Sequence, residues 1–589
     1  MMFADRRPFV LLDDARPGGT ARLYRDPARV ISATSVEEIP DALVAIRAGI
    51  VGGYEAAGYL TYEAGAAFVA RAPDVAAGPT PLLWFGLFDG HEAIDGDAVT
   101  ALLPDPAGTW VGTVDPDITR ADYDAAFDRV IELIRAGDIY QANLTFSATV
   151  RCAGDPLNLY ARLRGQAAAG HGALVDTGET MLLSLSPESF FTLDGDTLGC
   201  RPMKGTAPRG ATPEEDRMRA AMLRNDEKQR AENLMIVDLM RNDLSRVAVA
   251  GSVAVPELFA VETYPTIHQM TSTVTATLAP DRDAIDVVTA LFPCGSITGA
   301  PKQRAMAVIA GVEARARGVY TGSIGRIDAS GAAFSVAIRT LVVNEPGVAT
   351  MGLGSGIVAD SQCDDEWAEC LAKSRFVTTG IRSPDLIETM AFDPEEGLLR
   401  LEAHLARMKD SATALGYAFD RHAARNELQA ATFRLRQARR IRLLLAVSGA
   451  IAIEVGALPS PPAGSISVAI VPLPLAPGDI RLRHKSSDRA FYDIARRASG
   501  AAEVVFESDG VLTEGSFTSL FVERADGMLV TPPLSRGLLP GILRGEMIES
   551  GHAIEGDVTV TDLARGFFVG NAVRGLMRAH VADANDGAL

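Results

Sequence analysis

The feature that most constrains the fold is a change of pattern about two thirds of the way along the chain. Residues 378–384 (TTGIRSP) are rich in breakers and follow a long stretch in which helical and strand-like patterns alternate. At 589 residues the chain is too long for one hydrophobic core. We therefore predict one domain over residues 1–380, with an N-terminal subregion of about 1–113 and a core of about 120–379, and a second domain over 384–589.

Charge and cysteine content exclude several classes of protein. A net charge of −19 argues against general nucleic-acid binding, because phosphate backbones require a basic surface. The chain has no apolar run long enough to span a bilayer, and Met1–Arg7 does not begin a signal peptide. The five cysteines lack CxxC and zinc spacing, so reduced thiols in a cytoplasmic protein are expected.

A lysine between two backbone-restricting residues is the first candidate for chemistry. Lys204 lies between Pro202, which fixes its own φ, and Gly205, which permits close backbone approach. The apolar run Met181–Leu185 precedes Ser186-Pro187-Glu188, so Glu188 and Lys204 end two neighbouring strand-like segments. An ordinary hairpin with a surface ion pair remains the alternative.

Carboxylates on two predicted helices follow. A long helix is expected from about Glu214 to Leu239, since no Pro or Gly interrupts it. Glu232 lies in an apolar part of it, and a helix with two apolar sides is expected to be buried.

Glu366, Glu369 and Lys373 have i, i+3, i+7 spacing and therefore share one helix face. For this helix alone, a solvated salt-bridge face is the favoured interpretation. Two glutamate sites from separate helices also suit Mg²⁺, which takes carboxylates, substrate and water.

Three weaker signals lie nearby in the sequence. The alternating glycines of residues 352–356 (GLGSG) can present backbone N–H groups to an anion, although the spacing is not a dinucleotide fingerprint. Arg339 is expected to close a strand and to be able to contact a carboxylate. His268 is a candidate catalytic residue, and a structural histidine is an equal alternative.

Together these segments resemble the chorismate-utilising enzymes, which include anthranilate synthase, isochorismate synthase and aminodeoxychorismate synthase component I. The matching segments occur in the family's order and are residues 186–188, 232–243, 293–302 and 354–373. The resemblance implies an α+β fold with two stacked antiparallel β-sheets flanked by helices.

The resemblance also implies roles for individual residues. Glu188 would be the general acid/base, and Mg²⁺ would bind Glu232 and Glu369, with Glu366 close by. The residues implied to contact or line the substrate are Arg339, Lys373, Gly354, Ser355, Gly356, Tyr320 and Thr298.

Lys204 separates the members of this family. The aminodeoxychorismate synthases carry a lysine here, whose neutral amine attacks chorismate and expels a hydroxyl, whereas anthranilate synthases carry a small residue. Ammonia then displaces the lysine. The chain has no Gly-x-Cys-x-Gly elbow of a glutaminase, so ammonia is expected from solution or from a separate glutaminase subunit.

The second part contains a different set of reactive residues. His404 and Arg407 share a face of the amphipathic segment 401–408, for which an exposed basic edge is the favoured interpretation when the segment is taken alone. Lys485, the strand-borne Glu514 and the predicted helix start near residues 540–544 are what pyridoxal phosphate (PLP) requires: a Schiff-base lysine, an acid for the pyridinium and free N–H groups for the phosphate.

These segments resemble the class IV aminotransferase fold, a two-subdomain α/β fold, over nearly all of 384–589. The resemblance makes Lys485 the Schiff-base lysine and Glu514 the pyridine partner. It implies phosphate contacts at Arg407 and at the Ile542 and Leu543 amides, and it admits a homodimer through this domain. Ser519 departs from the asparagine of many members, which leaves one local contact undefined.

Three functions are therefore weighed. The first is a bifunctional enzyme that makes 4-aminobenzoate, a folate precursor, from chorismate by amination and then PLP-dependent elimination of pyruvate. The second is an anthranilate- or isochorismate-type synthase fused to a branched-chain or D-amino-acid transaminase, which Lys204 disfavours. The third is a non-catalytic regulatory protein, which the complete set of acids, bases and lysines disfavours.

Overall fold

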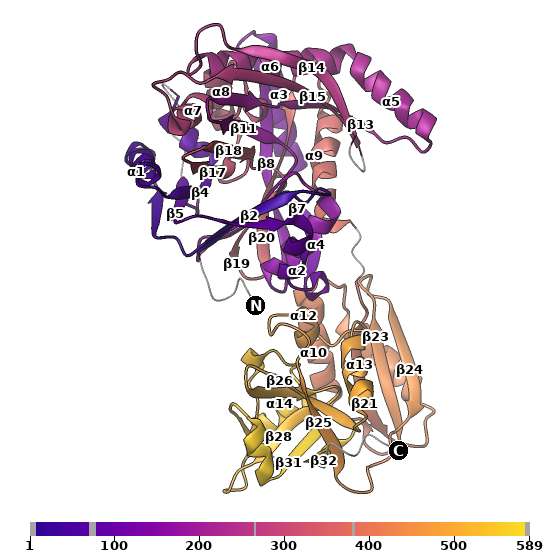
Figure 1. The fold of residues 1–589 in the computed structure, drawn as a ribbon. Coiled ribbons are helices and arrows are strands. Elements are labelled where there is room, and N and C mark those ends of the chain that lie inside the picture. The colour runs from indigo at the N-terminus through magenta and orange to yellow at the C-terminus, as the bar shows by residue number, and fades with distance from the viewer. Residues whose placement is uncertain (1–7, 70–77, 264–266, 380–382, 583–589) are drawn as a thin grey trace. The chain divides into compact units, whose positions relative to one another are not determined.

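The computed structural model describes residues 8–69, 78–263, 267–379 and 383–582 (Figure 1). The chain forms two compact units. The first comprises Met1–Leu103, Thr113–Val150 and Tyr160–Thr379, and the second comprises Pro104–Gly112, Arg151–Leu159 and Gly380–Leu589. The pattern change at residues 378–384 includes residues 380–382, and both these and Met1–Arg7 lie outside the described residues.

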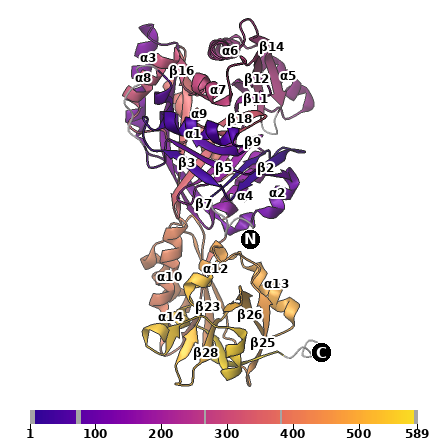
Figure 2. The same ribbon diagram turned by 60° about the vertical axis from the view of Figure 1, so that its left-hand side comes forward.

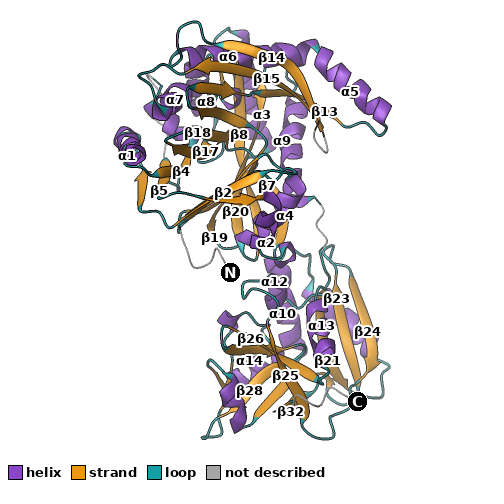
Figure 3. Cartoon of the chain, in the orientation of Figure 1, coloured by secondary structure: helices purple, strands orange, loops and turns teal. Residues whose placement is uncertain are grey.

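Two ten-stranded sheets dominate the first unit (Figure 3). Neighbouring strands pair antiparallel, for example β1 with β2 and β17 with β18. The first sheet contains β1 (Phe9–Asp13), β2 (Thr20–Arg25), β6 (Glu92–Asp95), β7 (Trp110–Pro116), β8 (Gln141–Ala153), β9 (His171–Asp176), β10 (Met181–Ser186), β16 (Gly299–Ala300), β19 (Thr340–Glu345) and β20 (Val348–Ile357). The second contains β3 (Arg29–Ala33), β4 (Glu55–Leu60), β5 (Leu83–Phe88), β11 (Ser189–Asp194), β12 (Thr197–Cys200), β13 (Met203–Pro208), β14 (Ala254–Thr263), β15 (Ile267–Thr277), β17 (Ser323–Asp328) and β18 (Gly331–Val336).

The two sheets stack through a shared hydrophobic core. Val10 and Tyr24 of the first sheet pack in one buried cluster with Tyr59 and Trp84 of the second. Successive side chains of a strand point to opposite faces of its sheet, so each sheet presents one apolar face to the other, and β5 and β10 are buried along their whole length. The α+β architecture with two stacked antiparallel sheets is therefore confirmed.

Nine α-helices flank these sheets. They are α1 (Ile39–Val51), α2 (Gly96–Leu102), α3 (Arg120–Arg135), α4 (Pro156–Ala167), α5 (Pro213–Asn225), α6 (Glu227–Ser245), α7 (Ala284–Leu291), α8 (Lys302–Val312) and α9 (Cys363–Thr378), counted within the described ranges. Helices α5 and α6 lie beside β14 in both views (Figures 1 and 2). Helix α9 packs against β20.

The prediction of a single helix from Glu214 to Leu239 is wrong, because two helices, α5 and α6, meet at Asp226. This residue has an extended ψ of 114°, and its side chain accepts a hydrogen bond from the Gln229 backbone N–H. An aspartate that caps a helix start can thus break a helical pattern that contains neither Pro nor Gly.

Helix α6 is also not buried on both sides. Its Asn233, Ile236, Val237 and Met240 are buried, whereas Leu234 is 43% exposed. One face packs against β13 and β15, and the opposite face meets solvent.

The second unit contains two smaller sheets. The four-stranded sheet is antiparallel and contains β21 (Leu386–Asp393), β22 (Gly397–Leu398), β23 (Arg439–Leu445) and β24 (Ile451–Ala457). The eight-stranded sheet is mixed, because β25 pairs parallel with β26 and β32. Its strands are β25 (Ile466–Pro472), β26 (Glu503–Ser508), β27 (Val511–Gly515), β28 (Ser519–Glu523), β29 (Leu529–Thr531), β30 (Ala553–Glu555), β31 (Phe567–Asn571) and β32 (Gly575–Val581).

Five α-helices of this unit are described: α10 (Leu401–Ala414), α11 (Arg421–Thr432), α12 (Ile480–Arg483), α13 (Ala490–Ser499) and α14 (Ile542–Glu549). Helix α10 packs on β21, and one face of β23 supplies Ile441, Leu443 and Leu445 to a buried core. The two-subdomain α/β fold expected for this part is confirmed.

Two further sequence expectations can be compared with the structure. All five cysteines are free thiols, in agreement with the cysteine spacing. Among the described helices, none combines the length and the apolar composition that crossing a bilayer requires.

A buried ion pair ties β1 to α4. The Asp13 carboxylate accepts hydrogen bonds from Arg164 Nε (2.7 Å), Arg164 Nη2 (3.1 Å) and the Tyr160 hydroxyl (2.8 Å). The Asp13 and Arg164 side chains are 0% and 9% exposed. Removing one partner of such a pair leaves a buried charge without compensation.

We therefore expect Arg164→Met to lower the free energy of unfolding of the first unit by about 3–5 kcal/mol, because Asp13 would remain buried without its cation. Urea titration measures this loss. Arg129→Met is the control, since the Arg129–Glu132 pair is 59% and 65% exposed and should contribute less than about 1 kcal/mol. Equal effects of the two substitutions would contradict the expectation.

Candidate active sites

Glu188 lies buried just beyond the end of β10. The Ser296 hydroxyl donates a hydrogen bond to Glu188 Oε1 at 2.8 Å. Burial raises the pKa of Glu188, while this bond and the positive charges of Lys204 and Lys373 act in the opposite direction. A carboxyl with a raised pKa can hold a proton nearer neutral pH, as a general acid must.

Lys204 extends from β13 of the second sheet to β20 of the first. Its Nζ lies 3.3 Å from the point that a Cβ on Gly356 would occupy, and Gln141 Nε2 lies 3.1 Å from the same point. The β13–β15 register shifts between Met203 and Thr206, and Gly205 within this irregularity has φ +92°. The glycine after the lysine is therefore needed for a backbone conformation that other residues rarely adopt.

Three glutamates from two helices lie close enough to interact electrostatically. Burial raises the pKa of Glu232 on α6, and the carboxylates of Glu366 and Glu369 on α9 add to this. Glu369 Oε1 lies 2.8 Å from Lys373 Nζ. Burial acts to raise the pKa of Glu369, but the charge and hydrogen bond of Lys373, together with the charges of Lys204 and Lys228, lower it. Glu366 Oε1 accepts a hydrogen bond from the Ser361 hydroxyl at 2.6 Å.

The chemistry of this donor set suits Mg²⁺, which binds carboxylate oxygens together with substrate and water. In the described part of the chain, however, no three His, Cys, Asp or Glu side chains are gathered closely enough to hold a metal ion by themselves. The glutamates therefore fit a metal shared with a ligand better than a cage made only of protein.

The glycines 352–356 belong to β20, a strand between β8 and β19. A Cβ on Gly352 would lie 1.9 Å from the Tyr320 ring, and a Cβ on Gly354 would lie 2.7 Å from the Leu144 carbonyl oxygen. Lys373 Nζ donates a hydrogen bond to the Gly354 carbonyl oxygen at 2.7 Å. Because glycine has no side chain, neighbouring residues can approach this strand closely. Ser355, which lies between Gly354 and Gly356, is buried.

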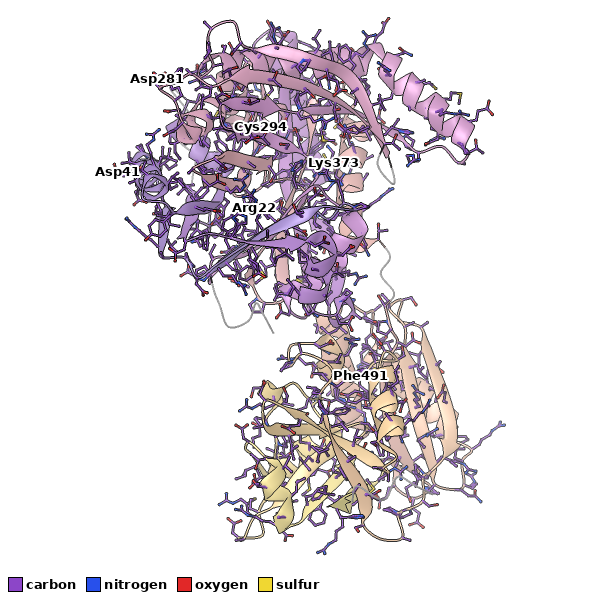
Figure 4. The ribbon with its side chains drawn as sticks, in the orientation of Figure 1. Arg22, Asp41, Asp281, Cys294, Lys373 and Phe491 are labelled. Atoms are coloured by element: carbon purple, nitrogen blue, oxygen red, sulfur yellow. The ribbon has the colours of Figure 1, made fainter. Side chains whose placement is uncertain are left out.

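The remaining candidates differ in their surroundings. Arg339 does not close a strand: it lies between β18 and β19 with φ +51°, and burial lowers its pKa. Thr298 is buried, and its hydroxyl donates to the Cys294 carbonyl oxygen at 2.8 Å. Cys294 and Lys373 are labelled in Figure 4. Tyr320 is buried, and burial raises its pKa.

The structure does not bring His268 to the Glu188 carboxyl. Both of its ring nitrogens are engaged elsewhere, Nε2 with Asp216 Oδ1 at 2.9 Å and Nδ1 with Thr263 Oγ1 at 3.0 Å. The imidazole therefore ties β15 to α5, which favours the structural alternative.

Two polar residues of this site were not singled out from sequence. Ser296 lies inside the motif 293–302, and only the fold shows that its hydroxyl meets Glu188. Gln141 begins β8, and its buried Nε2 has no hydrogen-bond partner among the described atoms. Neither residue carries a charge or spacing that would mark it in a sequence.

The second unit contains a cavity of about 590 Å³ lined by Lys485, Arg407, Glu514, Ile542 and Leu543, all predicted cofactor contacts. The Lys485 carbonyl oxygen accepts a hydrogen bond from the Ile387 N–H at 2.8 Å, which ties the lysine segment to β21. Burial lowers the pKa of Lys485 to about 7. Glu388 opposes this shift, and nearby arginines support it.

Glu514 lies on β27 and is 4% exposed. Burial raises its pKa to about 7. The Tyr492 hydroxyl donates to Glu514 Oε1, and the Leu539 N–H donates to Oε2 at 3.1 Å. The ring of Tyr492 packs 4.0 Å from that of Phe491, which is labelled in Figure 4.

The interpretation of the 401–408 segment as an exposed basic edge is wrong, because Glu388 of β21 pairs with its His404 and Arg407. Arg407 Nε and Nη2 donate to the Glu388 carboxylate at 2.8 and 2.7 Å, and His404 Nδ1 lies 2.6 Å from Glu388 Oε2. The Arg407 guanidinium and the hydrogen bond with His404 hold the pKa of Glu388 far below its usual range despite burial. Burial lowers the pKa of His404, which is one of the residues lining the cavity. Its buried Nε2 has no hydrogen-bond partner among the described atoms.

Helix α14 begins at the cavity. Gly541 precedes it without a side-chain cap, so the first-turn N–H groups remain available to an anion. A Cβ on Gly541 would lie 2.5 Å from Ser519 Oγ, which also lines the cavity. A buried lysine with a lowered pKa, a buried acid and an open helix start fit PLP.

Comparison with known proteins finds a family match for each of the two parts of the chain. The model of chorismate binding enzymes matches residues 7–379, and that of amino-transferase class IV matches residues 385–581. Aminodeoxychorismate synthase component 1 of Escherichia coli is 45% identical over 258 residues, which are 44% of this chain and 57% of that protein. Anthranilate synthase component 1 of Haloferax volcanii is 39% identical over 283 residues, which are 47% of this chain and 54% of that protein.

The chain thus spans little more than half the length of these curated relatives. Among solved structures, anthranilate synthase component I from Streptococcus pneumoniae superposes with a TM-score of 0.54 at 25% identity, covering 63% of this chain and 92% of that one. The residues matched by the two family models, 7–379 and 385–581, include both candidate sites. The chain belongs to the chorismate binding enzymes and carries a class IV amino-transferase domain as its second part.

Proposed function

We propose that this chain makes 4-aminobenzoate from chorismate in two steps, amination in the first unit and elimination of pyruvate in the second. The observation that carries the proposal is the approach of the Lys204 amine to Gly356, in a site that also contains the buried Glu188 carboxyl. A nucleophilic amine beside a proton donor suits replacement of a ring hydroxyl.

In the first step Lys204 Nζ forms a bond to the chorismate ring as the hydroxyl leaves with a proton from Glu188. Ammonia then forms the new C–N bond, and the bond to Lys204 breaks, which regenerates the amine. The product is 4-amino-4-deoxychorismate. Arg339, Lys373 and the β20 backbone would hold the substrate carboxylates, with Tyr320 and Thr298 lining the site.

Mg²⁺ would be held by Glu232, Glu366 and Glu369 and would supply positive charge for the substrate carboxylates. Ammonia would come from solution or from a separate glutaminase subunit. The component 1 designation of the E. coli relative supports a partner of this kind.

In the second step Lys485 would remove the ring proton, and the enolpyruvyl group would leave as pyruvate as the ring becomes aromatic. PLP held in this cavity would supply the electron sink for this elimination, and the Lys485 amine would then be free to act as the base. Glu514 would hold the pyridine nitrogen. Arg407 and the first amides of α14 would hold the phosphate.

Purified protein supplied with chorismate, Mg²⁺, ammonium and PLP should form 4-aminobenzoate, identified by chromatography and mass. Lys485→Ala should accumulate aminodeoxychorismate, because the base for ring deprotonation is lost. Lys204→Ala should form neither product, because the first bond cannot form.

Lys409→Ala removes an exposed lysine of α10 and should behave like the unmodified protein. Anthranilate, or no aromatic amine, would disprove the proposed function. Normal 4-aminobenzoate formation by Lys485→Ala would disprove the lyase assignment alone.

Glu188→Gln should slow chorismate consumption by about 10²–10⁴-fold, because the amide cannot donate a proton to the leaving hydroxyl. The rate is measured with saturating ammonium, so that nucleophile supply does not limit it. Glu179→Gln changes an exposed glutamate beyond β9 and should leave the rate unaltered. Full activity of Glu188→Gln would exclude it as the general acid.

The low pKa of Lys485 predicts the pH at which the apoprotein takes up PLP. Below about pH 7 the amine is protonated and cannot attack the aldehyde, and above it the amine is neutral. PLP incorporation, followed by absorbance after removal of free cofactor, should therefore rise through pH about 7. A midpoint near pH 10, the range of an ordinary lysine, would contradict the effect of burial.

A further inference from the structure

The two-step reaction above gives no role to the buried thiol of Cys294, which is labelled in Figure 4. Cys294 is 4% exposed and packs in the same core cluster as Cys200. Its Sγ lies 3.3 Å from Ser296 Oγ, and the Ser296 hydroxyl donates to Glu188 Oε1 at 2.8 Å. The three side chains therefore form one hydrogen-bonded chain, Cys294–Ser296–Glu188, which ends at the proposed general acid.

A short turn holds the first two members of this chain in place. Residues Gly295–Ile297 form a 3₁₀ turn, and Cys294 immediately precedes it. The Thr298 N–H donates to the Gly295 carbonyl oxygen at 3.2 Å, and the Thr298 hydroxyl donates to the Cys294 carbonyl oxygen at 2.8 Å. A Cβ on Gly295 would lie 2.2 Å from Leu239 Cδ2, so α6 packs directly against the turn. The backbone that carries both side chains is thereby fixed.

The number of protons in the chain fixes the direction of its hydrogen bonds. A serine hydroxyl has one proton, and the Ser296 proton is directed to the Glu188 carboxyl. Toward sulfur the Ser296 oxygen can therefore only accept, so the Cys294 thiol is the donor. Burial raises the pKa of Cys294 to about 12, and the charge of Glu188 acts in the same direction. The thiol consequently keeps its proton at neutral pH and can donate it.

The same direction determines which oxygen of Glu188 carries the acid proton. A hydroxyl proton directed at Oε1 makes that oxygen an acceptor, which leaves the acid proton on Oε2. When Glu188 protonates the departing hydroxyl, negative charge develops on its carboxyl group. A donor that is already aligned with the carboxyl stabilises this charge without reorganisation. The aligned Ser296 hydroxyl thus favours proton transfer from Glu188.

We propose that Cys294 is a positioning residue for proton donation by Glu188: its thiol donates to Ser296 Oγ and so keeps the Ser296 proton on Glu188 Oε1. The inference rests on the proposed function, in which Glu188 is the general acid. The Cys294 proton stays on sulfur throughout, and only the Glu188 proton moves to the leaving hydroxyl. A thiol is a weak donor, so its contribution to the rate is modest.

Three lysines from other elements face this chain. Lys204 of β13 and Lys373 of α9 act on Glu188. Lys302 of α8 acts on Cys294. Substitution of Cys294 leaves all three lysines in place, so a change in the protonation of Glu188 is attributed to the hydrogen-bonded chain.

The first test measures chorismate consumption by the full-length protein with Mg²⁺, PLP and saturating ammonium. Cys294→Ala should lower kcat by about threefold to tenfold with a smaller change in KM, because the Ser296 hydroxyl loses its alignment. Cys294→Ser retains a donor at this position and should keep kcat near that of the unmodified protein. Cys200→Ala is the matched control, since it removes a thiol that is buried in the same core but lies outside the hydrogen-bonded chain, and it should leave kcat unchanged.

The second test is infrared spectroscopy of the full-length protein in the absence of substrate, so it depends on no reaction. The S–H stretching band of Cys294, identified by its loss in Cys294→Ala, should shift in Ser296→Ala to the frequency of a thiol without a hydrogen bond. The band of the protonated Glu188 carboxyl, identified by its loss in Glu188→Gln, should titrate about 0.5 pH unit higher in Cys294→Ala. The sign follows because the Ser296 hydrogen bond lowers the pKa of Glu188 and the substitution weakens that bond.

An S–H band that does not move in Ser296→Ala would overturn the proposal, because the thiol would then not donate to Ser296. Equal kcat values in Cys294→Ala and the unmodified protein would overturn it as well. If Cys294→Ser were as slow as Cys294→Ala, the thiol would act only by filling space, which also contradicts the proposal. Failure of the unmodified protein to consume chorismate would instead disprove the proposed function, and the infrared spectra would still decide whether the hydrogen-bonded chain exists.

Discussion

The buried contact between the Ser296 hydroxyl and the Glu188 carboxyl illustrates the constraint on which both sites depend. An ionisable group removed from water is stable only if the fold supplies a partner or keeps the group neutral. Burial raises the pKa of Glu188, and the hydrogen bond from Ser296 and the charges of Lys204 and Lys373 offset this only in part. Glu388 has an arginine and a histidine in direct contact, and its pKa is strongly lowered. Two buried glutamates therefore have pKa values shifted in opposite directions, because the fold supplies them with different partners.

Close approach between strands is the second requirement. The Lys204 amine reaches the first sheet because Gly356 has no side chain to occupy the space, and Tyr320 packs over Gly352 for the same reason. In the second unit Gly456 makes room for Arg440, and Gly541 lies against Ser519. In each case a glycine on one element lets a side chain of another element come close to the backbone.

The sequence predicted the elements better than their surroundings. The apolar run Met181–Leu185 became β10, and the 401–408 segment became part of α10, because hydrophobic period reports local geometry. The helix over 214–239 failed at Asp226, where a cap competes with continuation of the helix. His404 and Arg407 were interpreted as an exposed edge because their acidic partner, Glu388, lies on a strand sixteen or more residues away.

Residue types and their order determined the two-part organisation, the family resemblance and the reactive candidates, since lysines, carboxylates and glycines in fixed spacing are visible in a linear chain. Only the tertiary structure decided which candidates meet. It joined Ser296 to Glu188, directed His268 to Asp216, and paired Arg407 and His404 with Glu388. The physical reason is that partners and burial depend on contacts between strands far apart in sequence, and no local pattern encodes those contacts.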